Sequence, residues 1–355
     1  MPRVLFVFID GVGLGADDPA VNALAAARLP TFERLLGGRR PTLPAATRAA
    51  APRHADGSPP AARTGPTGDA GAAGDVATAT LVALDASLGV DGLPQSGTGQ
   101  AALLTGVNAA ARFGRHYGPW VPTALRPLVA DESVLARAKR AGLRVAFANA
   151  YPEEAVDPPP ASARRSRRSP LRAGPPLAAL GAGLLTRHTA ALARGDAVAS
   201  EITNDGWRAR LGRREVPEIS AAEAGRNLGR IAAAHDLTLY AHYTTDTAGH
   251  HRDLAAAIHA IERVDTFLGG VLETLPADTL LLVASDHGNL EDARVGHTRN
   301  PALALVHGAG HAAAAGRLRA LTDVAGVALG TVGAEFRDRG RRGQGREMAS
   351  DADEP

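Results

Sequence analysis

The chain has 355 residues, enough for one large α/β domain with a smaller lobe. Its formal charge of +2 is nearly neutral, and its arginine-rich stretches 164–172 and 337–346 lack interleaved aromatic residues, so we expect no nucleic-acid partner. The absence of cysteine excludes disulfides, zinc fingers and a thiol nucleophile.

The N-terminal stretch "MPRVLFVFIDG" predicts a strand over residues 3–9, and a helix is expected over roughly 20–36. The apolar run is too short for the core of a signal peptide and lacks a small-residue cleavage site. No uncharged stretch in the chain is long enough to cross a bilayer. We therefore expect a cytoplasmic protein with no membrane partner.

Residues 37–76 are rich in Gly, Pro, Ala and Arg and show no sustained period, which predicts a disordered insertion. Order resumes at "ATLVALDASLGVDGLPQSGTGQ", where a strand leads through a Gly/Pro turn to Ser96 and a helix near 99–104. Residues 1–110 are thus expected to form the first part of a core domain.

Residues 111–219 differ from the flanking segments in sequence pattern and are expected to form a small cap lobe inserted into the core domain. They contain a predicted helix at 131–141, a strand at 144–151 and a weakly helical region near 177–195. The Pro- and Arg-rich stretch 155–176 within this lobe is expected to be flexible.

The second part of the core is expected over residues 220–336. "SAAE" provides a capping box for a helix at 221–234, a long helix is expected at 252–273 and a last helix at 318–329. The predicted strands between them are "LTLYAHYTTD", "TLLLVASD" and "ALALVH". Strands that alternate with helices indicate an α/β fold with a mostly parallel sheet covered on both faces. Residues 337–355 are expected to be a disordered tail.

Polar side chains stand where the predicted strands end, and parallel strands bring their carboxyl ends to one edge of a sheet. The residues at these ends are Asp10, Ser96, Asp246, Asp286 and His287. Two histidines extend the set: His250 lies four residues after Asp246, one helical turn away, and His297 follows in "GHTRNP". Aspartate and histidine ligands suit Zn²⁺ or Mn²⁺, whereas an all-oxygen site would suit Mg²⁺ or Ca²⁺.

Each of these residues has an ordinary structural explanation when it is taken alone. Asp10 before Gly11 could form a turn into a helix, Ser96 could be a helix cap, and a single histidine is usually a surface or a satisfied core residue. Their joint placement at strand ends favours a metal site over these separate explanations.

The motifs "FIDGVG", "SDHGN", "DTAGH" and "GHT" resemble the metal-binding motifs of the alkaline phosphatase superfamily, most closely its cofactor-independent phosphoglycerate mutase and phosphopentomutase branch. The resemblance implies an alkaline phosphatase-like core with two divalent ions. One ion would be held by Asp10, Ser96, Asp286 and His287, and the other by Asp246, His250 and His297. Gln95, Gly97 and Gln100 depart from the family pattern around Ser96.

The same resemblance implies that Ser96 is a nucleophile that forms a phosphoserine on a small phosphorylated substrate. The backbone amides of Gly97, Thr98 and Gly99 are expected to help hold the phosphoryl oxygens. "ARFGRHYGPW" offers Arg115 and His116 as substrate-binding residues, although a polar surface turn explains them equally well.

Several reactions remain open from the sequence. Transfer of the phosphoryl group to water would make a phosphatase, and its return to another position of the substrate would make a phosphomutase. A nucleotide phosphodiesterase could use the same metal pair, and a metal-stabilised binding module without turnover is the alternative from another class. A sulfatase is disfavoured because "SGTGQ" lacks the Cys/Ser-x-Pro-x-Arg pattern.

Overall fold

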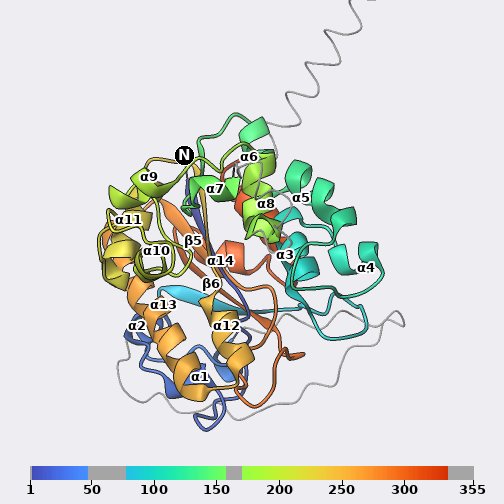
Figure 1. The fold of residues 1–355 in the computed structure, drawn as a ribbon. Coiled ribbons are helices and arrows are strands. Elements are labelled where there is room, and N and C mark those ends of the chain that lie inside the picture. Colours follow the sequence, from blue (N-terminus) through green and yellow to red (C-terminus); the bar gives the residue numbers. More distant parts are fainter. Residues whose placement is uncertain (1, 47–76, 157–169, 335–355) are drawn as a thin grey trace, which may run out of the picture.

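The computed structural model describes residues 2–46, 77–156 and 170–334 (Figure 1). Within these ranges one six-stranded sheet crosses the molecule. Its strands are β1 (Arg3–Ile9), β2 (Ala79–Leu84), β3 (Val145–Phe147), β4 (Leu237–His242), β5 (Thr279–Ala284) and β6 (Ala302–Gly308). None of the helices in the described ranges combines the length and the apolar character needed to cross a membrane.

The strand order is β2-β6-β5-β1-β4-β3. β1 pairs in parallel with both β4 and β5, and β3 pairs in parallel with β4. β6 runs antiparallel to β5 and to β2, so it is the reversed strand of this otherwise parallel sheet. The predicted mostly parallel α/β sheet is therefore confirmed.

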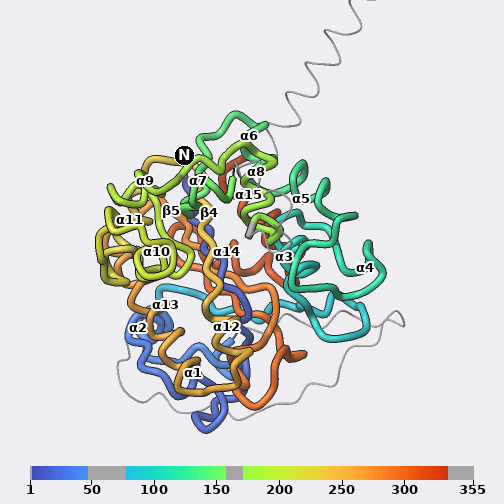
Figure 2. The backbone as a smooth tube through the Cα atoms, in the orientation of Figure 1, coloured from blue at the N-terminus to red at the C-terminus, as the bar shows by residue number. Residues whose placement is uncertain are grey.

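Helices cover both faces of this sheet (Figure 1). One face carries α1 (Ala23–Ala26), α2 (Pro30–Leu35), α11 (Ala221–Ala233) and α13 (Leu254–Thr274). The other face carries α3 (Ser96–Thr105), α5 (Arg126–Glu132), α6 (Val134–Arg140), α8 (Gly174–Gly181) and α15 (Asp323–Thr331). The backbone trace in Figure 2 shows the first helices of the chain lying beside α13, far away in sequence.

The remaining helical segments complete the described part of the chain. The α-helical ones are α4 (Ala109–Phe113), α7 (Glu153–Val156), α9 (Thr189–Ala193), α10 (Asp205–Ala209), α12 (Thr244–His251) and α14 (His311–Ala315). The 3₁₀ turns are Leu43–Ala45, Thr123–Leu125 and Pro170–Arg172.

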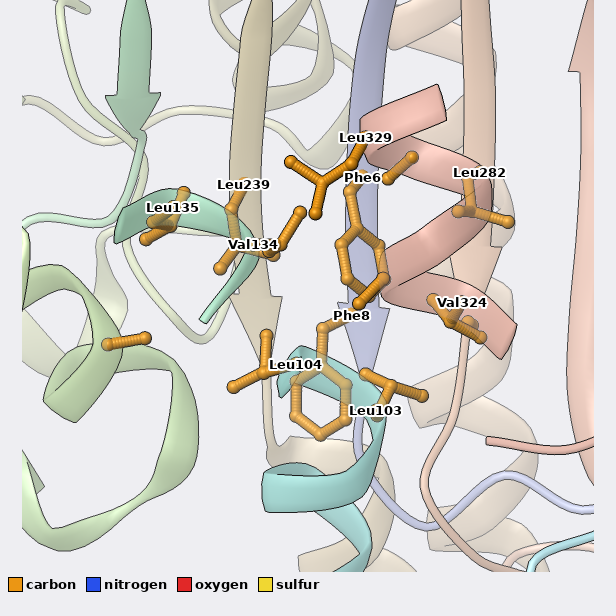
Figure 3. Close-up of a cluster of buried hydrophobic side chains, with 14 of the residues drawn as sticks. Phe6, Phe8, Leu103, Leu104, Val134, Leu135, Leu239, Leu282, Val324 and Leu329 are labelled. Atoms are coloured by element: carbon orange, nitrogen blue, oxygen red, sulfur yellow. The ribbon is translucent and has the colours of Figure 1, made fainter. Parts of the chain in front are cut away.

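Strand β1 lies in the middle of the sheet and is buried on both sides because its side chains alternate between the two faces. Phe6 and Phe8 enter one hydrophobic cluster, and Leu5 and Val7 enter the other. Figure 3 shows Phe6 and Phe8 packed among leucine and valine side chains from α3, α6, α15 and the neighbouring strands. A strand buried on both faces needs an uninterrupted apolar run, and "VLFVFI" provides one.

Three element predictions were wrong in detail. The helix expected over 20–36 is split into α1 and α2, because residues that precede Pro30 disfavour helical backbone. The strand expected over 144–151 is limited to Val145–Phe147. The strand expected to run to Asp246 ends at His242, and the remaining residues begin α12.

The segment predicted as a cap contributes to the main sheet and also forms a small cluster of its own. β3 is the edge strand next to β4. Residues from α9, α10 and the loops around them form a separate cluster that includes Leu192, Trp207 and Val216. The division of the chain into a core and a cap lobe stays a prediction.

The predicted insertion, flexible stretch and tail fall partly outside the described residues. Residues 37–46 of the insertion are described, and the Leu43 amide donates to the Gly15 carbonyl at 2.8 Å. Residues 47–76, 157–169 and 335–355 lie outside the described ranges.

Candidate metal centre

The carboxyl ends of three adjacent strands, β5, β1 and β4, bring the predicted site residues to one edge of the sheet. Asp10 follows β1, and its amide donates to the His242 carbonyl at the end of β4. Asp286 and His287 follow β5 directly. Ser96 is the first residue of α3, which packs against this edge.

Four of the predicted residues form what we call the inner cluster: Asp10, Ser96, Asp286 and His287. Each of the four is at most 6% exposed. Nε2 of His287 lies 2.9 Å from Ser96 Oγ, 3.4 Å from Asp10 Oδ1 and 3.7 Å from Asp286 Oδ2. These two carboxylate oxygens are buried and have no hydrogen-bond partner. A buried carboxylate oxygen without a donor is costly, and a cation is the partner that this geometry lacks.

The other three residues form the outer cluster: Asp246, His250 and His297. Oδ2 of Asp246 lies 3.4 Å from His250 Nε2, and its Oδ1 lies 3.7 Å from His297 Nε2. Nε2 of His250 and Nε2 of His297 face each other at 3.2 Å. Nδ1 of His297 lies 2.8 Å from the Pro94 carbonyl, which assigns the proton to Nδ1 and leaves a lone pair on Nε2.

The two clusters are adjacent. Asp246 Oδ1 lies 3.9 Å from His287 Nε2, and ligand atoms of Asp246, His287 and His297 all fall within 4.8 Å of one another. The structure therefore brings all seven predicted ligands together. Carboxylate oxygens and imidazole nitrogens converging in this way fit divalent cations.

The charges of the inner cluster are unbalanced. Burial raises the pKa of Asp10 well above its ordinary value, and the charge of Asp286 raises it further. Burial alone would lower the pKa of His287, but Asp286, Asp10 and Asp246 together raise it to about 10. Burial also raises the pKa of Asp286. The crowded carboxylates thus lack positive charge, which a divalent cation supplies.

His297 has the opposite electrostatic situation. Burial lowers its pKa to about 4, and the charge of His287 acts in the same direction. The imidazole therefore stays neutral at neutral pH. Neutral imidazole is the form that binds a metal.

Comparison with known proteins relates the C-terminal third of the chain to a known superfamily. A family model described as the Metalloenzyme superfamily matches residues 216–336. A 2,3-bisphosphoglycerate-independent phosphoglycerate mutase from Desulforudis audaxviator is 37% identical over 125 residues, covering 33% of this chain and 25% of that protein. One from Paracoccus denitrificans is 38% identical over 130 residues, covering 34% and 25%. The chain is therefore related to the Metalloenzyme superfamily through residues 216–336. It spans about a quarter of the length of these mutases.

One solved structure agrees with this chain in fold, and a second aligns more weakly. The PH0037 protein from Pyrococcus horikoshii aligns with a TM-score of 0.52 and 12% identity over 94% of this chain and 97% of that chain. An alkaline phosphatase from the Antarctic bacterium TAB5 aligns with a TM-score of 0.45 and 9% identity over 94% and 99%. The family model covers the motifs "DTAGH", "SDHGN" and "GHT" and supports the resemblance inferred from them, whereas "FIDGVG" lies outside the matched residues.

Gln100 is a site residue whose role the sequence left open. Its Nε2 donates to Asp10 Oδ2 at 3.0 Å, and its Oε1 accepts from the Gly174 amide at 2.8 Å. It therefore fixes the orientation of Asp10 and ties α3 to α8. The spacing of four residues from Ser96 on one helix was the available signal.

Asn289 and Glu291 were missed by the sequence reasoning. The side-chain Nδ2 of Asn289 donates to Asp246 Oδ1 at 2.7 Å, and the backbone N–H of Asn289 donates to Glu291 Oε2 at 2.8 Å. Glu291 also accepts from the Gly13 amide at 2.9 Å. These residues orient the Asp246 carboxylate and join the loops after β1 and β5. Asn289 stood inside the quoted motif "SDHGN", but its partner is known only from the fold.

The backbone amides of Gly97, Thr98 and Gly99 were expected to hold phosphoryl oxygens, and this expectation is wrong for Thr98 and Gly99. The Thr98 amide donates to the Tyr117 carbonyl at 3.0 Å, and the Gly99 amide donates to the Gln95 carbonyl at 2.8 Å. Neither N–H is therefore left for a substrate. The glycines serve close packing instead: a Cβ on Gly99 would lie 2.9 Å from the Asp286 carbonyl oxygen.

A cavity of about 310 Å³ opens beside the inner cluster. Asp10, Ser96 and Asp246 line it together with Trp120, Tyr151 and Tyr243. Arg115 and His116 are not among the described residues that line it. The Arg115 guanidinium lies 5.9 Å from the Phe113 ring centre, and His116 Nε2 lies 3.2 Å from the Val90 carbonyl. Their substrate-binding role stays a prediction that no contact with this cavity supports.

Proposed function

We propose that this protein is a metal-dependent phosphoryl-transfer enzyme that acts on a small phosphorylated molecule with Ser96 as the nucleophile. The observation that carries the proposal is the position of Ser96 Oγ, 2.9 Å from His287 Nε2 in a cluster with two unpartnered carboxylate oxygens. The match of residues 216–336 to the Metalloenzyme superfamily and the partial similarity to phosphoglycerate mutases support this class of reaction.

The inner and outer clusters would each hold one divalent cation. Mn²⁺ or Zn²⁺ suits them because the ligands mix carboxylate oxygen with imidazole nitrogen. When bound, such ions lower the pKa of a coordinated hydroxyl and neutralise the oxygens of a phosphoryl group. Gln100 and Asn289 would keep Asp10 and Asp246 oriented toward these ions.

Ser96 is placed for attack by the start of α3. Its hydroxyl would release its proton to solvent, and Oγ would form a bond to phosphorus while the bond between phosphorus and the ester oxygen breaks on the opposite side. The leaving oxygen would take a proton from solvent, and Ser96 would carry the phosphoryl group. Transfer of this group to water completes a phosphatase cycle, and its return to the substrate at another position completes a mutase cycle.

The test is a panel of phosphomonoesters, with a phosphodiester as comparison, assayed with Mn²⁺ while both free phosphate and isomerised product are followed. Ser96→Ala should abolish turnover and leave the metal content, measured by inductively coupled plasma mass spectrometry, close to that of the wild type. Ser87→Ala is the matched control, because Ser87 bonds to Asp85 outside the site. Acid quenching followed by mass spectrometry should find a phosphate on Ser96.

Retained turnover in Ser96→Ala would exclude the nucleophilic role. Preferential cleavage of the diester would favour a nucleotide phosphodiesterase. Tight metal binding without turnover of any ester would favour the metal-stabilised binding module. A cytoplasmic location stays a prediction.

A further inference from the structure

The walls of the cavity beside the inner cluster carry little charge. Beyond the proposed ligands Asp10, Ser96 and Asp246, the lining consists of aromatic rings, small apolar side chains, hydroxyls and one amide. The rings belong to Trp120, Tyr151 and Tyr243. None of the described residues that line the cavity is arginine, lysine or histidine.

The tyrosine hydroxyls add no charge to the cavity walls at neutral pH. Burial raises the pKa of both Tyr151 and Tyr243. Both rings therefore stay neutral, with their hydroxyls available only for hydrogen bonds. Tyr243 is further held by an edge contact with Phe8 at 6.1 Å between ring centres.

These walls discriminate between substrates by charge. A second anionic group on the substrate would lose its hydration next to aromatic rings and would lie near the carboxylates of Asp10 and Asp246. No cationic side chain in the described lining would compensate for the lost water. A neutral aromatic or apolar group would instead gain from burial and from ring contacts. The cations of the two clusters would be occupied by the phosphoryl group itself.

Basic side chains occur nearby, but they line two other hollows. Arg210 lines one that shares Tyr151 and Ser200 with the cavity, and its guanidinium is already paired with Glu201 at 2.6 Å. His251, His259 and Arg263 surround a space of about 210 Å³ on the side of α12 and α13. Thr247 is the lining residue that this hollow shares with the cavity. A charged substrate tail would have to pass Thr247 to reach these side chains.

We propose that the substrate is a phosphomonoester of an uncharged aromatic or apolar alcohol, and that a phosphorylated acid such as phosphoglycerate is excluded by the cavity walls. This inference rests on the proposed function, because it assumes that the phosphoryl group binds at the two clusters. It assigns substrate selection to Trp120, Tyr151 and Tyr243.

The test measures binding separately from turnover. The chain has two tryptophans, so Trp207→Phe leaves Trp120 as a fluorescent reporter inside the cavity. The Zn²⁺-loaded protein is titrated with benzylphosphonate and with 4-carboxybenzylphosphonate, which differ by one carboxylate and cannot be hydrolysed. We expect benzylphosphonate to bind at least about tenfold more tightly. Equal or tighter binding of the carboxylated ligand, or no binding of either, would overturn the inference.

Two variants test which side chains cause the preference for the uncharged ligand. Trp120→Ala, followed by calorimetry, should weaken benzylphosphonate binding about tenfold and leave methylphosphonate binding unchanged. Arg263→Gln should leave the preference unchanged. A preference for the carboxylated ligand that disappears in Arg263→Gln would overturn the inference and assign the acid to the hollow at Arg263.

Turnover then separates the two proposals. We expect benzyl phosphate to be cleaved with a kcat/KM at least about tenfold above that of 4-carboxybenzyl phosphate. Cleavage that favours the carboxylated ester would refute the inference and leave the phosphoryl-transfer function intact. Tighter binding of benzylphosphonate without cleavage of either ester would refute the phosphoryl-transfer function, whereas the preference of the cavity for neutral groups would stand.

Discussion

The buried histidine at the end of β4 should make this protein sensitive to mild acid. His242 is 1% exposed, with Nδ1 at 2.8 Å from the Ser200 carbonyl and Nε2 at 2.9 Å from Thr244 Oγ1. The neutral ring satisfies both contacts, because Nδ1–H donates to Ser200 and Nε2 accepts from the Thr244 hydroxyl. Protonation of Nε2 would place a positive charge in the core and force the Thr244 hydroxyl to change from donor to acceptor.

The size of the effect follows from the pKa. Burial lowers the pKa of His242 to about 4, and the charge of Arg263 also lowers it. An unfolded histidine titrates near 6.5, so the unfolded chain binds more protons between these two values. The free energy of unfolding should therefore fall as the pH drops from about 6.5 to about 4. The difference between the two pKa values corresponds to about 3 kcal/mol.

The assay is urea unfolding in the presence of a chelator at a series of pH values from neutral to about 4. His242→Asn removes the titration and keeps polar atoms near both partners, and His307→Asn is a control at a histidine bonded to Thr78. The wild type and the His307 variant should lose about 3 kcal/mol more than the His242 variant across this range. Parallel pH profiles for all three proteins would refute the assignment of a neutral buried His242.

Three further predictions concern the packing and the metals. Gly97→Ala should destabilise the fold by about 1–3 kcal/mol in urea unfolding, because its Cβ would lie 2.1 Å from the Trp120 carbonyl oxygen. Gly326→Ala, with nothing near the added methyl, should be neutral or stabilising, and an equal loss in both would contradict the packing argument. Asn289→Ala should weaken Zn²⁺ binding in calorimetry by about 10- to 100-fold, and an unchanged Kd would show that Asp246 needs no support. Chelation should lower the Tm, and Zn²⁺ or Mn²⁺ at 100 times its Kd should restore about 2.7 kcal/mol of stability; a Tm indifferent to metal would remove the basis for both cation sites.

The strands of the core were predictable because burial on both faces demands continuous apolar runs. "VLFVFI" and "TLLLVA" could form little else in an alternating α/β pattern. The reversed direction of β6 was not predictable, since "ALALVH" would be equally apolar in either direction. The edge position of β3 was likewise missed, because its short run carries no signal for its neighbour in the sheet.

Some residues of the candidate site could be predicted from the sequence, and others could not. Asp10, Asp286 and His287 could be predicted because they interrupt apolar strands where the chain reaches the edge of the sheet. Gln100 and Asn289 could not be assigned, because their function lies in a hydrogen bond to a residue distant in sequence. Trp120 ends the same stretch "ARFGRHYGPW" that contains Arg115 and His116, and only the fold separates the residue that lines the cavity from the two that do not.

The central position of β1 has a consequence for biosynthesis. This strand is synthesised well before its two neighbours, residues 237–242 and 279–284. An apolar segment must therefore stay unpaired until these later strands have been made, which exposes the nascent chain to aggregation. In the proposed metal centre, cation binding would be complete only after His297 has been synthesised, so a nascent chain without this residue would lack part of the outer cluster.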